Sequence, residues 1–88
     1  MAWKIEFDEL AQRELYKLDA QHRQRARKFL DRLALLDDPH SIGDRLHGVK
    51  FGNCWKYRMG DYRLICRIDD EQSTVLVLRV GHRKEIYR

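Results

Sequence analysis

Two neighbouring segments of the sequence carry basic side chains at positions that alternate with apolar ones. Residues 54–59 read CWKYRM, residues 62–68 read YRLICRI, and Gly60-Asp61 separates them. Glycine at the first central position of a two-residue turn is typical of a type II′ β-hairpin. In such a hairpin Arg58 lies directly opposite Arg63, and Lys56 lies one cross-strand step away on the same face.

This arrangement has an energetic cost and a chemical use. Like charges directly opposite each other destabilise a sheet by roughly 0.2–1 kcal/mol per pair. The planar guanidinium group of arginine, however, is well suited to binding phosphate oxygens. We therefore expect Lys56, Arg58 and Arg63 to form a cationic cup for a phosphate group. The alternative is a solvated outer face on which the long side chains diverge.

The cysteines and histidines do not predict a metal centre. The hairpin register places Cys54 and Cys66 on opposite faces, so neither a disulfide nor a shared metal site is expected between them. The four histidines are not spaced with a cysteine or carboxylate as metal ligands usually are. We expect no metal ion and no cofactor.

The elements that must position the hairpin follow from the spacing of apolar residues. Residues 3–7 alternate apolar and charged side chains, and residues 74–80 also have strand character. Asp8 and Asp19 are suitable N-caps for two helices, and Pro39 is expected to end the second one by restricting Asp38. The order strand, helix, helix, strand, strand, strand predicts an α+β fold. Two N-terminal helices would pack on one face of a small, mostly antiparallel sheet.

The positive charge of the chain is concentrated in its second half. The formal net charge is +4 over 88 residues. Residues 1–44 hold eight basic and nine acidic side chains, whereas residues 45–88 hold ten basic and five acidic ones. This asymmetry favours a polyanionic partner for the second half. The basic residues of the second helix are expected on its solvent face: Arg23, Arg25, Arg27, Lys28 and Arg32.

Length and hydropathy limit the class of protein. The chain suits one small domain, which we expect to span residues 1–88. The longest apolar runs contain four residues, and a membrane-spanning helix needs about 20. The first residues do not resemble a secretory signal. We therefore expect a cytoplasmic protein that does not act at a membrane.

Several segments of the sequence resemble the RelE/ParE superfamily of bacterial toxins. They are Leu46-His-Gly, Trp55-Lys-Tyr-Arg, Gly60-Asp-Tyr-Arg-Leu-Ile and Val80-Gly-His-Arg-Lys-Glu-Ile-Tyr-Arg. The resemblance covers almost the whole chain and implies the RelE-like fold, in agreement with the order of elements above. RelE-like members of the family cleave messenger RNA in the ribosomal A site, whereas ParE-like members inhibit DNA gyrase.

The resemblance to the RelE-like branch implies a set of catalytic residues. The matching positions are Lys56, Arg58, Arg63, Arg83 and Tyr87. The implied reaction is metal-independent attack of the 2′-OH on the neighbouring phosphate. Lys56 is the expected base, because repulsion from the two flanking arginines favours its neutral form. Arg58 and Arg63 would hold the phosphate, Arg83 would neutralise or protonate the leaving side, and Tyr87 would orient or stack on a base.

The resemblance also implies partners. A toxin of a type II toxin–antitoxin system is expected to bind a cognate antitoxin, in a complex that can assemble further, and to act on ribosomes and mRNA, which inhibits translation. A ParE-like gyrase inhibitor without nuclease activity and a plain nucleic-acid-binding module remain alternatives. Lys56 and Tyr87 distinguish these classes best, because binding alone needs neither a reactive amine nor a terminal phenol.

Overall fold

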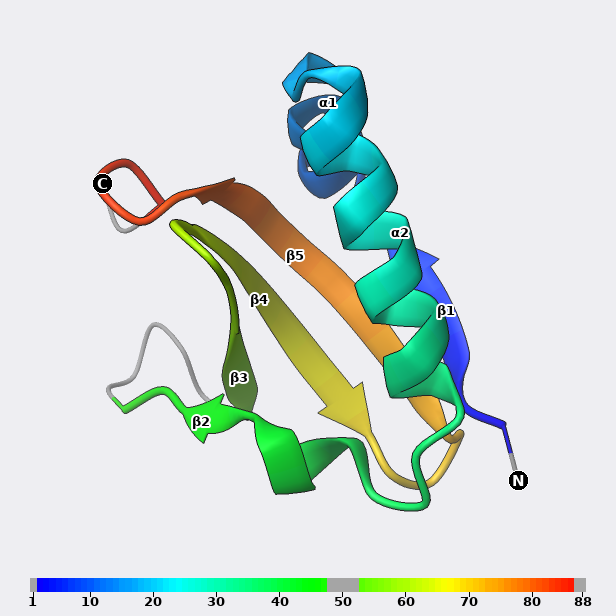
Figure 1. The fold of residues 1–88 in the computed structure, drawn as a ribbon. Coiled ribbons are helices and arrows are strands. Elements are labelled where there is room, and N and C mark those ends of the chain that lie inside the picture. Colours follow the sequence, from blue (N-terminus) through cyan, green and yellow to red (C-terminus); the bar gives the residue numbers. More distant parts are fainter. Residues whose placement is uncertain (1, 48–52, 87–88) are drawn as a thin grey trace.

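The computed structural model describes residues 2–47 and 53–86. The chain begins with β1 (Lys4–Phe7), α1 (Glu9–Lys17) and α2 (Ala20–Ala34). A short 3-10 helix η1 (Pro39–Ile42) and β2 (Asp44–Arg45) follow. The last elements are β3 (Cys54–Met59), β4 (Tyr62–Asp69) and β5 (Thr74–His82), as Figure 1 shows. None of the helices in these ranges is long and apolar enough to cross a membrane.

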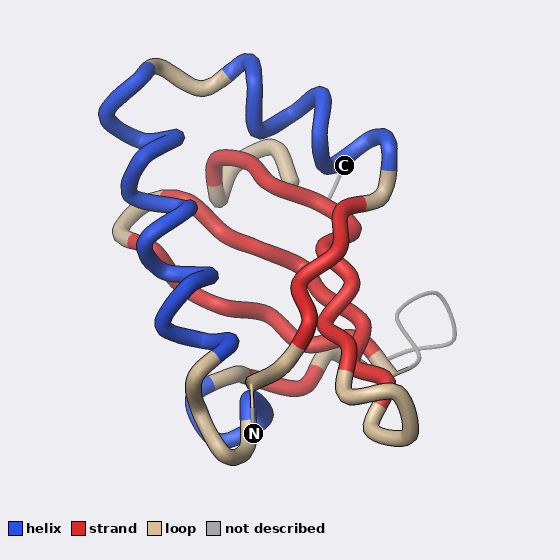
Figure 2. The backbone as a smooth tube through the Cα atoms, turned by 90° about the vertical axis from the view of Figure 1, so that its right-hand side faces the viewer, coloured by secondary structure: helices blue, strands red, loops and turns tan. Residues whose placement is uncertain are grey.

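The strands form one mixed sheet in the order β1-β5-β4-β3-β2. β1 pairs with β5 in parallel, and the other neighbours pair antiparallel. The strand that comes last in the sequence therefore lies inside the sheet, between β1 and β4. Figure 2 shows the helices as a layer beside the strands. The predicted α+β fold, with both helices packed against a mostly antiparallel sheet, is confirmed.

The two helices begin at the predicted caps, but the second ends earlier than expected. The Asp8 carboxylate accepts the N–H of Glu9 at 2.7 Å, and the Asp19 carboxylate accepts the N–H of His22 at 2.9 Å. The prediction that α2 continues to Asp38 is wrong, because the helix ends at Ala34. The proline instead begins η1, since its fixed φ angle suits the first position of a helix.

The predicted hairpin register is confirmed pair by pair. Arg58 pairs with Arg63, Lys56 with Ile65, and Met59 with Tyr62. Gly60 has a φ angle of +63°, which the first central position of a type II′ turn requires. The face of the hairpin under the helices contributes Trp55, Tyr57, Met59, Tyr62, Leu64 and Cys66 to the main core.

A second, smaller apolar cluster lies on the opposite face of the sheet. Cys54, Ile65 and Ile86 are at most 2% exposed, and Leu46 and Leu78 pack against them. Ile86 thus ties the segment after β5 back onto the sheet. The two cysteines belong to different clusters, as the register predicted, and burial raises the pKa of the Cys66 thiol to about 12.

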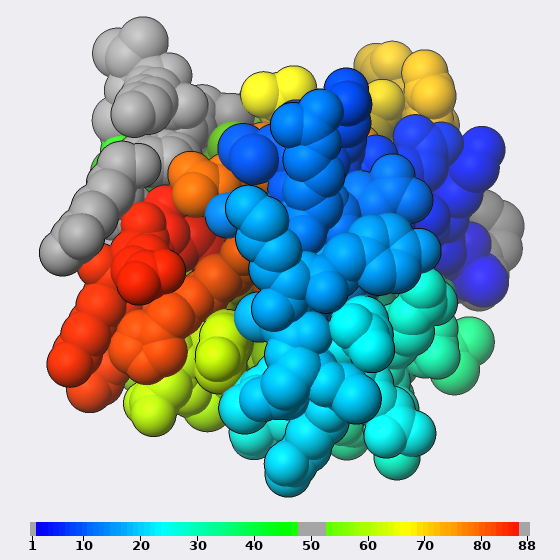
Figure 3. All heavy atoms as spheres, turned by 90° about the horizontal axis from the view of Figure 1, so that it is seen from above, coloured from blue at the N-terminus to red at the C-terminus, as the bar shows by residue number. Residues whose placement is uncertain are grey.

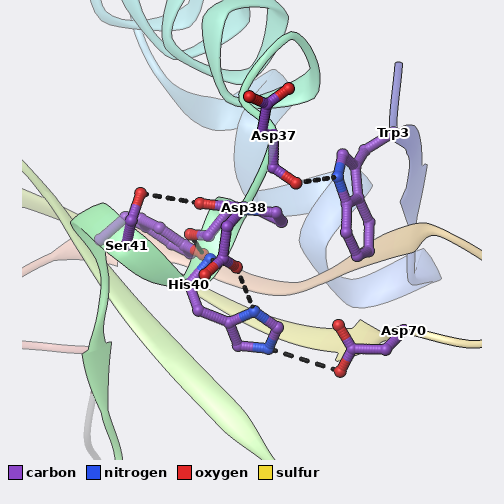
Figure 4. Close-up of polar contacts among 8 residues, drawn as sticks. Trp3, Asp37, Asp38, His40, Ser41 and Asp70 are labelled. Carbon is purple, nitrogen blue, oxygen red and sulfur yellow. Dashed lines mark hydrogen bonds and ion pairs between the residues drawn. The ribbon is translucent and has the colours of Figure 1, made fainter. Parts of the chain in front are cut away.

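Several polar contacts lie at the end of the sheet that is opposite the β3–β4 turn (Figure 1, Figure 4). Nδ1 of His40 lies 2.7 Å from the Asp38 carboxylate, and Nε2 lies 3.6 Å from the carboxylate of Asp70 in the β4–β5 turn. Trp3 Nε1 donates to the carbonyl of Asp37 at 3.3 Å. These contacts join the segment after α2 to Trp3 before β1 and to the β4–β5 turn. Hydrogen bonding to His40 lowers the pKa of Asp38.

A buried hydrogen bond fixes the segment that carries β2 against β3. Tyr57 Oη donates to the carbonyl oxygen of Pro39 at 2.6 Å. The tyrosine ring also lies against Gly43, where a Cβ atom would come within 2.9 Å of the Tyr57 Cε1 atom. This close approach requires glycine, and it brings β2 alongside β3.

The Tyr57→Phe substitution should therefore lower the free energy of unfolding by about 1–3 kcal/mol, because it leaves a buried carbonyl without its donor. Tyr16→Phe is the matched control, since Tyr16 is 60% exposed and should lose less than about 0.5 kcal/mol. Urea unfolding of both variants measures the difference. Equal stabilities would show that the Tyr57 hydroxyl does not hold η1.

Candidate functional site

Three of the predicted catalytic residues lie on one face of the hairpin. Lys56 and Arg58 are two residues apart in β3, and Arg63 is the cross-strand partner of Arg58. Their face is the one that does not contribute to the main core. Arg58 is exposed, whereas Lys56 and Arg63 are partly buried. We refer to these three residues as the basic face.

Arg83 follows β5 at the same end of the sheet. Tyr62 pairs with His82 across β4 and β5, and the N–H of Arg83 donates to the Asp61 carbonyl at 2.8 Å. The Arg83 Nε atom lies 3.9 Å from an Asp61 carboxylate oxygen, in an exposed and weak pair. The sheet order therefore brings Arg83 next to the hairpin turn, although more than 20 residues separate Arg83 from Lys56 in the sequence.

The Arg63 head group is held at the turn by main-chain oxygens. Its Nη1 atom donates to the carbonyls of Gly60 at 2.6 Å and Tyr62 at 2.9 Å. These bonds draw part of the guanidinium toward the turn, and they leave Nε and Nη2 as donors for another group. The structure brings the three residues of the basic face together at the backbone, and convergence of their head groups on one phosphate stays a prediction.

Sequence reasoning missed a carboxylate beside the basic face. β2 pairs with β3 so that Asp44 lies directly opposite Lys56. Such residues point to the same face, with Cβ atoms about 4.5–5.5 Å apart. The exposed Asp44 carboxylate therefore offsets part of the positive charge around Lys56. A strand of two residues has no alternation to detect, so only the pairing reveals this neighbour.

One basic residue of α2 reaches the hairpin turn. A Cβ atom on Gly60 would lie 3.1 Å from the Arg25 Nη1 atom, so the Arg25 side chain is close to the turn. The same side chain is exposed to solvent. Arg23 differs from the expectation of a fully solvated side chain, because its Nη1 donates to the carbonyls of Tyr16 and Leu18. The other basic residues of this helix are exposed as predicted: Arg27, Lys28 and Arg32.

An ion pair between α1 and β5 fixes the helix layer beside this end of the sheet. Arg79 Nε and Nη2 donate to the two oxygens of Glu14 at 3.0 and 3.1 Å. The same carboxylate accepts the N–H of Val80 at 3.1 Å. Hydrogen bonding to Glu14 raises the pKa of Arg79. Because β1 pairs with β5 only as far as Val77, Glu14 provides a partner for the strand beyond that point.

Tyr87 of the predicted site lies outside the described residues, and so does the glycine of the Leu46-His-Gly segment that carries part of the family resemblance. Within the described ranges, the histidine, cysteine and acidic side chains do not gather in groups of three or more that could hold a metal ion.

Comparison with known proteins identifies the family. Residues 5–87 match the family of ParE toxins of type II toxin–antitoxin systems. The chain belongs to the RelE/ParE toxin superfamily. It is 38% identical over 88 residues to Toxin RelG of Mycobacterium tuberculosis, covering 100% of this chain and 99% of the relative. It is 33% identical over 91 residues to the mRNA interferase toxin RelE of Escherichia coli K12, covering 99% and 92%.

Solved structures of toxins from this superfamily share the fold. The toxin–antitoxin complex RelBE2 of M. tuberculosis matches with a TM-score of 0.83 and 33% identity, over 94% of this chain and 100% of the matched chain. The intact RelBE complex of E. coli matches with a TM-score of 0.75 and 28% identity, over 92% and 96%. This protein is therefore a type II toxin of the RelE family, and the resemblance inferred from its motifs is confirmed.

The Asp44→Asn substitution should tighten the binding of single-stranded RNA to this toxin by about 2- to 5-fold at low salt, because it removes a negative charge next to Lys56. Asp31→Asn is the matched control, since Asp31 is an exposed residue of α2 in the helix layer. Fluorescence anisotropy with a labelled oligonucleotide measures both affinities. An equal gain in the two variants would mean that only net charge matters.

Proposed function

We propose that this toxin is a ribosome-dependent endoribonuclease that cleaves mRNA in the A site without a metal ion. The observation that carries the proposal is the common face of Lys56, Arg58 and Arg63, which the β3–β4 register fixes. Arg83 lies at the same end of the sheet. The similarity to an mRNA interferase toxin of E. coli supports this function.

The proposed reaction is an internal transfer at phosphorus. The 2′-OH attacks the neighbouring phosphate, the bond to the 5′ oxygen breaks, and the products carry a 2′,3′-cyclic phosphate and a 5′-OH. Lys56 in its neutral form accepts the proton of the 2′-OH. Arg58 and Arg63 donate hydrogen bonds to the phosphate oxygens, where negative charge grows in the transition state. Arg83 neutralises charge on the leaving 5′ oxygen, which takes a proton from water to become the 5′-OH.

The ribosome supplies the part of catalysis that this set of residues lacks. Arginine is a poor proton donor because its guanidinium stays protonated in proteins. Alignment of the 2′-OH with the phosphate in the A site lowers the barrier without any acid or base. Tyr87 is proposed to orient or stack on a base there. Translating ribosomes are therefore the proper substrate for a test, and naked RNA is not. Because ribosomes are cytoplasmic, we also propose that this toxin acts in the cytoplasm.

We also propose that an antitoxin of the RelB type binds and silences this toxin. The proposal is supported by the similar solved structures, which are complexes of a toxin with its antitoxin. An amphipathic antitoxin helix with acidic side chains would suit the exposed basic residues of α2. In the same complex, an acidic segment near the basic face would compete with RNA for Arg58 and Arg63.

Gyrase inhibition is the second candidate function, because the matching family is described as ParE toxins. Such an inhibitor would block supercoiling or trap cleaved DNA, and would leave mRNA whole. A gyrase inhibitor does not need Lys56 to accept a proton.

The Lys56→Ala substitution should reduce mRNA cleavage on translating ribosomes by about 100-fold or more, because the methyl group can neither accept a proton nor carry charge. Primer extension measures the cut within the A-site codon, and end analysis shows the cyclic phosphate or 3′-phosphate and the 5′-OH. A supercoiling assay with purified gyrase runs in parallel. Intact mRNA beside inhibited gyrase would replace this proposal by the second candidate.

Arg58→Ala and Arg63→Ala should each slow single-turnover cleavage and reduce the salt dependence of RNA binding by about 0.7 in logarithmic slope, because each removes one phosphate contact. Arg27→Ala is the matched control, since it removes the same charge from an exposed position of α2. Arg25 is unsuitable as a control because it contacts the hairpin turn. Equal rate losses for Arg27 and Arg58 variants would contradict the assignment of the basic face.

A further inference from the structure

A polar pocket is formed around Tyr62 at the end of the hairpin. Its volume is about 420 Å³, and its lining consists of His22, Arg25, Gly60, Asp61, Tyr62 and His82. Figure 3 shows this end of the hairpin, in yellow-green, between the helices and the end of β5 in orange. The pocket thus joins α2, the β3–β4 turn and β5 on the helix side of the sheet, which is the face opposite the basic face.

Two imidazole rings flank the tyrosine ring in this pocket. The centroid of the Tyr62 ring lies 4.5 Å from that of His22 and 5.6 Å from that of His82. The first pair is tilted by 41° and the second is nearly perpendicular, at 81°. Rings in this arrangement present flat and edge surfaces that a planar ligand can stack on or contact side-on.

The hydrogen bonds at the Nδ1 atoms of the two histidines determine whether each Nε2 atom is a hydrogen-bond donor or acceptor. Nδ1 of His22 lies 2.8 and 2.9 Å from the two oxygens of Asp19, so it carries a proton. Nδ1 of His82 accepts the N–H of Lys84 at 3.2 Å, so the proton of the neutral ring is on Nε2. Nε2 is therefore an acceptor in neutral His22 and a donor in His82. Neither Nε2 bonds to another described residue.

We propose that this pocket binds one nucleotide of single-stranded RNA beside the cleavage site, which rests on the nuclease function proposed above. The base packs against Tyr62 and the imidazole rings, where its edge meets one donor and one acceptor. Arg25 binds the phosphate. The Gly60-Asp61 turn lines the pocket and connects the two strands that carry the basic face, and His82 directly precedes Arg83. An RNA strand on the basic face therefore reaches the pocket by passing around the hairpin end to the opposite face of the sheet.

The lining favours a nucleotide over an acidic peptide. Arg25 is the one arginine or lysine among the residues that line the pocket, and Asp61 lines it as well. A peptide with several acidic residues would meet repulsion from Asp61, whereas a nucleotide brings one phosphate and one planar base. The three rings therefore supply more of the expected affinity than charge does.

Binding of an uncleavable RNA tests the pocket apart from catalysis. The probe is a labelled single-stranded decamer with 2′-O-methyl riboses, and a second probe has the same backbone with abasic nucleotides. We expect the toxin to bind the first probe about tenfold more tightly than the second, as base stacking on aromatic rings allows. This preference should fall several-fold in His22→Ala and in His82→Ala, and the contact proposed for Tyr87 would account for the part that remains. An unchanged preference in both variants would overturn the proposal.

Two further variants exclude indirect effects. His82→Phe keeps a ring but loses the bond to Lys84, so it should retain the preference for bases if stacking produces it. Arg25→Ala should weaken both probes several-fold, and Arg27→Ala, which removes the same charge from the same helix, should weaken them much less. Equal losses in the two arginine variants would overturn the assignment of Arg25. Thermal unfolding confirms that each variant is folded.

The outcome separates this proposal from the nuclease proposal. If ribosomal mRNA is cleaved and the preference for bases does not depend on His22 or His82, the pocket proposal alone fails. If the preference depends on both histidines and mRNA stays intact, the pocket binds RNA and the nuclease proposal fails. A labelled hexaglutamate peptide that binds more tightly than RNA, and loses affinity in His22→Ala, would assign the pocket to a peptide instead.

Discussion

The register of the β3–β4 hairpin decides which side chains reach the core and which reach the solvent. It depends on the two-residue turn at Gly60, whose positive φ angle suits glycine. A shift of one residue would send Tyr57 and Leu64 to the solvent face and bring basic residues under the helices. Each buried apolar side chain opposes that shift by about 1.5–3 kcal/mol. The core on one face therefore holds the like charges of the other face opposite each other, against a repulsion of less than about 1 kcal/mol.

The fold gathers cations from several elements at one end of the sheet. The hairpin contributes Arg58 and Arg63, β5 leads into Arg83, and α2 contributes Arg25. The opposite end has acidic side chains, among them Asp38 and Asp70, which lie on either side of His40. This separation of charge orients the molecule so that the hairpin turn faces an approaching polyanion. Exposed charges act in this way over roughly a Debye length, about 8 Å at physiological salt.

Much of the fold and the framework of the site could be predicted from the sequence, because both follow from short-range patterns. Alternation over Cys54–Met59 fixed the faces of the hairpin, and the two aspartate caps fixed where the helices begin. Features that depend on distant contacts were missed. β2 exists only through its pairing with β3, so Asp44 beside Lys56 has no local signal.

The same reason explains the missed contacts of the helices. The sequence shows Arg25 and His22 on the polar side of α2, but the crossing of that helix over the hairpin end brings them to Tyr62. The end of α2 was misjudged because proline stops a helix and also starts one, and here it does the second. The pairing of Glu14 with Arg79 likewise joins residues 65 positions apart.

The position of β5 inside the sheet has a consequence for biosynthesis. Of the described strands β1 is made first, and the one strand it pairs with among the described residues, β5, begins at Thr74. Nascent chains shorter than this cannot close the sheet, and non-local pairing of this kind slows folding because the loop must close first. The end of β5 also carries Arg83 into place. The sheet, and with it the position of Arg83, therefore forms only after synthesis has passed β5, so folding of this toxin follows the synthesis of all five described strands.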